Sequence, residues 1–300
     1  MRSVALLTAV TAVIVTILLL SIAGGMATHD GARPTIYVDD DGTQPYLRIK
    51  NAVYFAKDGD TVFVYEGTYS DEYIQINKSI QLIGENKFST IIKGQITITA
   101  DNVTISNFTI KGTDRHPLYD FYIDNGLILH SNGNVVTDCI VKQNNGGIEI
   151  FDASHNIIKN CLIRDNSCGI SVSGTSEGNI IYHNNFINNK QKTLYSDISI
   201  PRNAYIESCQ YPQQWNSSIE GNYWDDYDGP DADRDGIGEI PYPLGGGCGD
   251  KDYYPLFSPL DLGSPKGDAD TGSATTPGFE GVIILLSLAI IFAIKRKLKK

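Results

Sequence analysis

The sequence predicts an all-β fold, a right-handed, single-stranded parallel β-helix, and three observations lead to this prediction. Short β-branched segments, each led by an asparagine, recur with steps of 22 and 23 residues, at Asn134, Asn156 and Asn179. A second asparagine follows ten residues after each of them, at Asn144, Asn166 and Asn189. No helical periodicity separates the segments, so each repeat predicts one turn of a solenoid with three short strands.

Stacked turns bring equivalent residues into ladders, because neighbouring strands of a sheet lie ~4.8 Å apart. We expect each asparagine series to form one internal ladder that satisfies the buried backbone of the turns. Cys139 should lie above Cys161 in the same way. Their spacing would allow a disulfide, but parallel Cβ vectors give it poor geometry, which favours two buried thiols.

The N-terminal part predicts a cap for the open end of the solenoid. Thr35–Val38 has the composition of a first strand. An amphipathic helix should follow, with its apolar positions at Ile49, Ala52, Val53 and Ala56. A short helix here would cover strand edges that the terminal repeat otherwise exposes.

Composition divides the chain into five segments. They are a signal peptide or signal anchor (1–26), a linker (27–34), the β-helix domain (35–258, with an N-terminal cap at 35–69 and an aromatic, acidic C-terminal cap at 203–258), a polar linker (259–277), and a membrane anchor or sorting signal with a basic tail (278–300). Both terminal segments are apolar enough to predict hydrophobic helices, and the basic tail places the C-terminus inside the cell. We therefore expect the domain on the extracellular face, anchored to the membrane or surface layer.

Export agrees with two further features. Sequons for glycosylation occur at Asn77, Asn102, Asn107 and Asn216. Cys209 and Cys248 lie outside the regular turns, and an oxidising compartment would allow them to form a disulfide.

The charge of the chain limits its partners. The formal net charge is −11, and residues 27–278, with 18 basic and 34 acidic residues, carry about −16. An acidic surface repels phosphate backbones, so nucleic acid is excluded as a partner, whereas divalent cations suit it.

Motifs at both ends of the domain resemble one family of surface proteins. The N-terminal matches are Tyr37-Val38-Asp39-Asp40-Asp41-Gly42, Gly59-Asp60-Thr61, Gly67-Thr68-Tyr69 and Ile83-Gly84-Glu85-Asn86. The C-terminal matches are Gly221-Asn222-Tyr223-Trp224-Asp225-Asp226-Tyr227, Gly229-Pro230-Asp231, Asp235-Gly236-Ile237-Gly238, Pro241-Tyr242-Pro243 and Tyr254-Pro255-Leu256. Over residues 35–258 the chain resembles NosD-type proteins, also described as carbohydrate-binding and sugar-hydrolase repeat domains, which implies a pectin-lyase-like β-helix.

The C-terminal segment carries a second resemblance. Pro277-Gly278-Phe279, an apolar stretch and a basic tail are similar to the sorting signal of archaeal surface proteins. That resemblance implies processing by an archaeosortase and replacement of the tail by a lipid; a plain transmembrane anchor is the alternative.

The acidic C-terminal cap holds a candidate calcium loop. Its residues follow the spacing of an EF-hand-like loop at positions 1, 3, 5, 7 and 9, namely Asp231, Asp233, Asp235, Ile237 and Glu239. Position 12 is Tyr242, so the bidentate glutamate is missing; Asp228, Asp250 or Asp252 would have to complete the site. A solvated acidic turn is the alternative.

Copper, which the family name suggests, suits this sequence poorly. Copper(I) takes thiolate, thioether or imidazole ligands. Both methionines lie in the signal region, and His155 and His183 do not stack on each other.

Three classes of function remain after these considerations. A hydrolase or lyase on this fold would use paired acids on one face, but Glu149, Asp152 and Asp165 form no evident pair, and no catalytic residue is assigned. A copper-handling role is the second alternative. We favour a non-catalytic module that binds an envelope polysaccharide or builds the cell surface, with the aromatic residues of the cap either stacking on sugars or closing the core.

Overall fold

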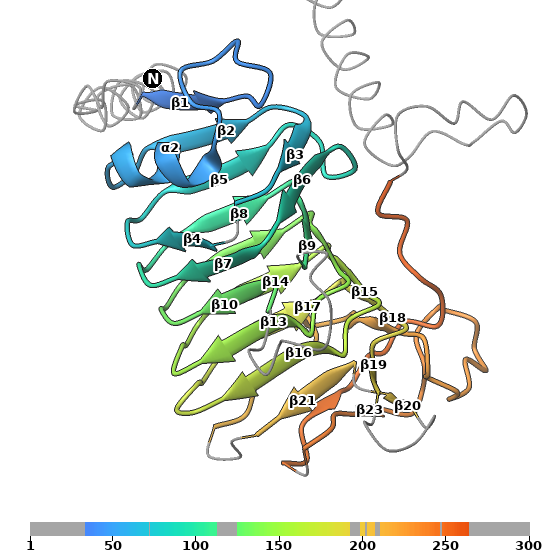
Figure 1. The fold of residues 1–300 in the computed structure, drawn as a ribbon. Coiled ribbons are helices and arrows are strands. Elements are labelled where there is room, and N and C mark those ends of the chain that lie inside the picture. The colour runs from blue at the N-terminus through green and yellow to red at the C-terminus, as the bar shows by residue number, and fades with distance from the viewer. Residues whose placement is uncertain are drawn as a thin grey trace, which may run out of the picture. The chain divides into compact units, whose positions relative to one another are not determined.

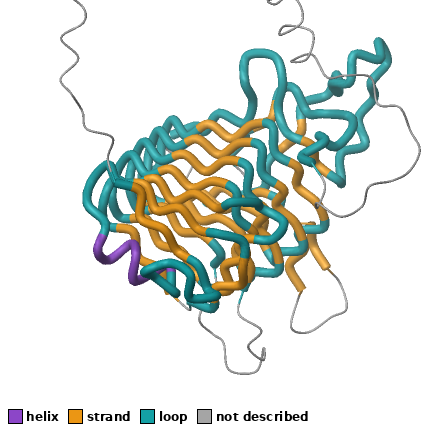
Figure 2. Tube along the Cα trace, turned by 90° about the horizontal axis from the view of Figure 1, so that it is seen from above, coloured by secondary structure: helices purple, strands orange, loops and turns teal. Residues whose placement is uncertain are grey.

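The parallel β-helix is confirmed by the computed structural model, which describes residues 34–71, 73–112, 125–192, 199–201, 203–207, 211–246 and 248–263. Three parallel sheets run along the solenoid, and each coil of the chain adds one strand to each sheet (Figure 1). Figure 2 shows the strands side by side, with the helix at one end and the longer loops at the other.

The strands of the first sheet, in spatial order, are β1 (Thr35–Val38), β2 (Thr61–Val64), β5 (Gln81–Gly84), β8 (Thr104–Ser106), β11 (Val135–Thr137), β14 (Ile157–Lys159) and β17 (Ile180–Tyr182). Those of the second are β3 (Gly67–Tyr69), β6 (Thr90–Lys93), β9 (Thr109–Lys111), β12 (Ile140–Lys142), β15 (Leu162–Arg164), β18 (Asn185–Ile187) and β22 (Tyr223–Trp224). Those of the third are β4 (Tyr73–Ile76), β7 (Gln95–Ile98), β10 (Leu127–Leu129), β13 (Gly146–Phe151), β16 (Cys168–Ser173) and β21 (Ala204–Ile206). Two short antiparallel pairs complete the fold, β19 (Lys190–Lys192) with β20 (Ser199–Pro201), and β23 (Tyr242–Pro243) with β24 (Lys251–Asp252).

The corners of the coils share one device that the periodicity alone did not reveal. A residue in the left-handed region stands directly before each inward-pointing ladder residue. Asp138, Asn160 and His183, each with φ of 54°, precede Cys139, Cys161 and Asn184. Gln143, Asp165 and Asn188 (φ 58°, 56° and 53°) precede the ladder of Asn144, Asn166 and Asn189. Asparagine, aspartate and histidine tolerate this conformation better than most residues, so the corner reads as a polar residue followed by a ladder residue.

Both predicted asparagine ladders are confirmed. The backbone N–H of Asn134 donates to Oδ1 of Asn156 at 2.8 Å, and that of Asn156 donates to Oδ1 of Asn179 at 2.9 Å. In the second ladder Asn144 donates to Asn166 at 3.0 Å and Asn166 to Asn189 at 3.1 Å. Each side-chain amide thus replaces a hydrogen bond that the sharp corner takes away from the backbone.

The cysteines behave as the spacing predicts. Cys139 and Cys161 are both buried, and both are free thiols. Burial raises the pKa of the Cys161 thiol well above its ordinary value, and the neighbouring Cys139 adds to the rise. Cys248 is disulfide-bonded, whereas Cys209, its predicted partner, lies outside the described residues.

The N-terminal helix forms where the sequence places it. α2 (Ile49–Phe55) buries Ile49, Ala52 and Val53 and packs against β4, the first strand of the third sheet. The helix therefore takes the place that a further strand would occupy and covers the open edge of that sheet (Figure 1).

The membrane segments predicted at 1–26 and 278–300 lie outside the described residues. Within the described ranges, no helix is both long and apolar enough to cross a membrane.

Replacing Asn166 with alanine should destabilise the fold by about 2–4 kcal/mol, because buried groups of two neighbouring coils lose their partners. The Asn166 side chain accepts from Asn144 and donates to the carbonyl of Val141 and to Oδ1 of Asn189. Chemical denaturation measures the loss. Asn145→Ala, at an exposed position one residue after the ladder, is the control and should change stability by less than about 0.5 kcal/mol. Equal effects of the two variants would contradict the role of the ladder.

Candidate functional site

The C-terminal cap is built on a stack of aromatic rings that starts in the core. Phe186 of β18 stacks on Trp224 at 4.4 Å, and Trp224 stacks on Tyr242 at 4.3 Å. Trp224 and Trp215 are both fully buried. The two tryptophans therefore close the core, and only the tyrosine end of the stack reaches the surface.

Each internal ladder ends on a carboxylate of the cap. Three residues extend the ladders beyond the regular coils, namely Gln213, Asn222 and Asn203. The aspartates that accept from them are Asp250 for Gln213, Asp252 for Asn222, and both Asp225 and Asp226 for Asn203. A carboxylate accepts only, so it can finish a chain of donors without leaving a buried donor unpaired.

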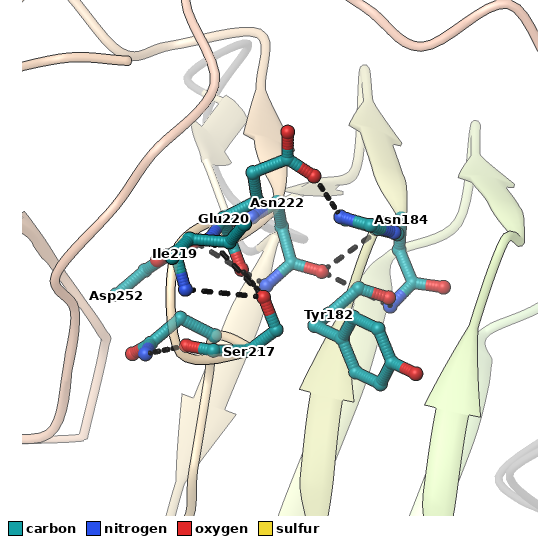
Figure 3. A network of polar contacts seen from close by, with 9 residues as sticks. Tyr182, Asn184, Ser217, Ile219, Glu220, Asn222 and Asp252 are labelled. Atoms are coloured by element: carbon teal, nitrogen blue, oxygen red, sulfur yellow. Dashed lines mark hydrogen bonds and ion pairs between the residues drawn. The ribbon is translucent and has the colours of Figure 1, made fainter. Parts of the chain in front are cut away.

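Asp252 is the most buried of these carboxylates. It accepts from the backbone N–H of Asn222 at 2.7 Å, the indole of Trp224 at 3.0 Å and the N–H of Tyr254 at 3.1 Å. Gly221 must lack a side chain, because a Cβ there would lie 1.9 Å from the Asp252 carboxylate. Figure 3 shows the link from Asn184 to Asn222, with Glu220, which bonds His183, beside it. The Gly-Asn-Tyr-Trp motif at 221–224 therefore holds the Asp252 carboxylate, with hydrogen-bond donors on Asn222 and Trp224 and a glycine that leaves room for it.

The predicted calcium loop brings together three of its four carboxylates. One carboxylate oxygen each of Asp231, Asp233 and Glu239 lies within 4.8 Å of the others. Glu239 Oε1 also accepts from the N–H of Ala232 at 2.6 Å. These three side chains could share one hard cation, with carboxylate ligands from both ends of the loop.

The other predicted ligands have different surroundings. Asp235 accepts from the N–H of Ile237 at 2.8 Å, which closes a local turn. Asp250 and Asp252, considered as further ligands, hold the ladder ends instead. Oδ1 of Asp231 is buried and has no hydrogen-bond partner, so a cation here would supply its missing contact.

Tyr227 fixes the base of this loop. Its hydroxyl donates to the carbonyl of Ile240 at 2.9 Å, on the far side of the loop. A Cβ at Gly229 or Gly238 would approach that hydroxyl to 2.1 or 2.0 Å. Both glycines are thus needed for the loop to close around the ring.

A surface pocket of about 420 Å³ opens beside the loop. Its two walls are residues 226–230 and 240–243, the segments that lead into and out of the acidic loop. Tyr242 forms part of the second wall, and its hydroxyl donates to Asp226 at 2.9 Å. Asp228 and Ile240 are exposed at the rim. An aromatic ring, carboxylates and prolines together suit a ligand with apolar faces and hydroxyl edges.

The acidic residues considered for catalysis are not brought together. Asp165 and Asp152 lie at opposite ends of the third-sheet strands, and Asp152 is bound to the N–H of Thr175 at 2.8 Å. Glu149 faces outward from β13, and burial raises the pKa of its carboxyl. The charge of His130 and a hydrogen bond from Asn125 lower this pKa, whereas the charge of Glu207 raises it further. Glu207 is thus the acidic neighbour of Glu149 that sequence spacing did not indicate.

The four sequons lie on the surface of the coils and the cap. Asn77 and Asn102 are exposed, and Asn107 and Asn216 are half-buried. Asn102 and Asn107 are also corner residues in the left-handed region.

Comparison with known proteins places the chain in a family. A profile described as periplasmic copper-binding protein (NosD) matches residues 56–229, more than half of the chain. The chain belongs to the NosD family. A probable ABC transporter binding protein NosD from Pseudomonas aeruginosa is 37% identical over 71 residues, which are 24% of this chain and 14% of that protein.

Solved structures with a similar course of the chain include sugar-polymer enzymes. A pectin methylesterase from carrot covers 61% of this chain and 72% of its own length, with a TM-score of 0.44 and 14% identity. Pectin methylesterase PemA from Erwinia chrysanthemi covers 61% of this chain and 71% of its own length, with a TM-score of 0.39 and 13% identity. An alginate lyase of family PL6 covers 63% of this chain and 34% of its own length, with a TM-score of 0.41 and 13% identity. At these scores and identities the similarity says nothing about activity.

The donor atoms of the described ranges do not fit the copper that the NosD description names. The only grouping there of three or more histidine, cysteine, aspartate or glutamate side chains is the all-carboxylate cluster of the acidic loop. His183 is bonded to Glu220, and His130 packs against Phe151. Hard oxygen ligands favour Ca²⁺ or Mg²⁺, whereas copper(I) takes sulfur and imidazole.

Asp252 should give the cap a pH-dependent stability. Burial raises the pKa of Asp252 to about 6 from 3.8. Between these values the folded protein holds a proton that the unfolded chain releases, so the contribution of Asp252 to stability falls as pH rises through this window, by up to about 3 kcal/mol. Urea unfolding of wild type and Asp252→Asn between pH 3.5 and 7.5 measures it. The difference between the two proteins should decline with rising pH; a constant difference would contradict this role.

Proposed function

We propose that this NosD-family protein is a non-catalytic module of the cell envelope whose C-terminal cap binds a carbohydrate in a pocket braced by a divalent cation. The pocket beside the acidic loop carries the proposal. Its two walls are the two ends of that loop, so a cation shared by Asp231, Asp233 and Glu239 would hold the walls at a fixed separation.

The chemistry of the pocket supports a sugar as the ligand. Tyr242 is held by its stack on Trp224 and by its hydrogen bond to Asp226, so little side-chain entropy remains to be lost on binding. Sugar rings present C–H faces to aromatic rings and hydroxyls to carboxylates, and the pocket offers both. Asp228, which is exposed at the rim, is the acceptor best placed for a ligand hydroxyl.

The location forms part of the proposal. The NosD family is periplasmic by description. An export signal at 1–26 and an anchor or archaeosortase-type sorting segment at 278–300 would display the domain on the outer face of the membrane, with 259–277 as tether. Protease treatment of intact cells tests this: release of the domain supports display, and full protection contradicts it.

Calcium should raise the melting temperature of the purified full-length protein, because three close carboxylates repel one another until a cation joins them. At a hundredfold excess over Kd the gain is about 2.7 kcal/mol, or about 5–10 °C for a domain of this size. Asp233→Ala should abolish most of the rise. Glu177→Ala, an exposed carboxylate on a solenoid corner, is the control and should retain it. An unchanged melting curve in millimolar calcium would leave the loop as a solvated acidic turn.

Glycan-array binding of the same protein should depend on the cation and on the pocket. We expect binding to a subset of glycans that EDTA weakens, and a loss of about tenfold in affinity for Asp228→Ala, because a hydrogen bond to a charged acceptor disappears. Tyr253→Ala, which removes an exposed aromatic ring outside the pocket, should bind as wild type.

The same experiment separates the hydrolase or lyase alternative. Glu149 and Glu207 supply the specific observation in its favour, a half-buried acid with a raised pKa beside a second carboxylate. Cleavage of a bound glycan that Glu149→Gln abolishes would favour the enzyme, whereas binding without cleavage favours the module.

A further inference from the structure

The outer face of the second sheet carries a row of positive charges in this acidic protein. Each basic residue is the last residue of its strand, and the four are in lateral register, namely Lys93 of β6, Lys111 of β9, Lys142 of β12 and Arg164 of β15. Neighbouring strands are ~4.8 Å apart, so the row runs parallel to the solenoid axis for about 14 Å. The strands β6, β9 and β15 can be followed along one side of the solenoid in Figure 1.

The charges of this row act on one another. All four side chains are half-buried. Burial lowers the pKa of Lys142, and the charges of Arg164 and Lys111 lower it further, while Asp165 acts in the opposite direction. Asp165 lies 3.4 Å from Arg164. Keeping like charges in register costs free energy, which an anionic ligand would recover.

A polar depression follows the same line at the adjoining corner. It has a volume of about 600 Å³ and is lined by the corner residues Gln143, Asp165 and Asn188 together with Ser167 and Lys190. Gln143 and Asp165 directly follow Lys142 and Arg164 in the chain. The depression therefore borders the charged row and adds amide and hydroxyl groups and one further exposed lysine to it. It also contains the Asp165 carboxylate, which pairs with Arg164 and accepts from the amide of Asn188.

We propose that the row of Lys93, Lys111, Lys142 and Arg164, with the bordering depression, binds a linear acidic polysaccharide along the solenoid axis. Carboxylates of the polymer would lie on the basic row, and its hydroxyls would reach the amides of Gln143 and Asn188. One feature favours a polysaccharide over single-stranded nucleic acid: the basic row contains no aromatic residue on which bases could stack. This site shares no lining residue with the cap pocket.

The test measures binding of polygalacturonate, a uronic acid polymer, to the full-length protein by calorimetry in low salt. Lys93 and Lys111 make other contacts in the chain, so the variant is Lys142→Gln/Arg164→Gln. We expect it to weaken binding about tenfold, because two charge pairs are lost. Lys142→Arg/Arg164→Lys keeps the charges and should bind nearly as wild type. Lys57→Gln/Lys159→Gln, at two basic positions outside the row, is the matched control and should also bind as wild type. Melting curves verify that each variant is folded.

Each outcome decides the proposal. Binding that falls with added salt, is lost selectively in Lys142→Gln/Arg164→Gln and is absent for a neutral galactan supports it. No binding to wild type, or equal losses in the control variant, overturns it. Stronger binding of single-stranded DNA than of polygalacturonate would show that the ligand class is wrong. The row is tested by Lys142→Gln/Arg164→Gln and the cap pocket by Asp228→Ala, and the two sites share no lining residue, so failure here is distinct from failure of the cap pocket.

Discussion

The satisfaction of backbone groups at the buried corners is the constraint on which the rest of this structure depends. A coil that bends sharply three times leaves N–H groups at the corners without partners in any sheet. The amide ladders supply these partners, each side chain bonding the backbone of the coil beside it. The requirement repeats once per coil, which is why the asparagines recur with the length of a coil.

The same constraint explains why the functional candidates gather in the C-terminal cap. A ladder of amides must end somewhere, and here the three ladders end on aspartates of the cap. Two of these endings converge on Tyr242: Asp252 pairs with it between β24 and β23, and Asp226 accepts from its hydroxyl. The ring that forms one wall of the pocket is thereby fixed to the core. Rigidity of this kind suits a binding surface, because little ordering remains for the ligand to impose.

The outward-facing residues of the coils are subject to different constraints from the inward-facing ones. Inward positions are constrained by packing and by the ladders, whereas outward positions of successive strands are free to vary and nevertheless stand in register. Like charges in such a row, as from Lys93 to Arg164, repel one another. The acidic loop and the basic row have opposite charge. The loop suits a divalent cation, whereas the row suits a polyanion.

The sequence by itself determined the solenoid, because the period of Asn134, Asn156 and Asn179 is a local pattern that repeats with the backbone requirement of each coil. It also determined the capping helix, since the apolar positions from Ile49 to Ala56 show its period directly. It determined the acidic loop only as a set of residues. The tertiary structure decided that Asp231, Asp233 and Glu239 gather while Asp235 closes its own turn, that Asp250 and Asp252 end ladders, and that the tryptophans lie in the core. These assignments depend on contacts between residues far apart in the chain, which no local spacing encodes. The basic row has the same origin: its steps of 18, 31 and 22 residues show no common period, and only strand pairing brings its members into line.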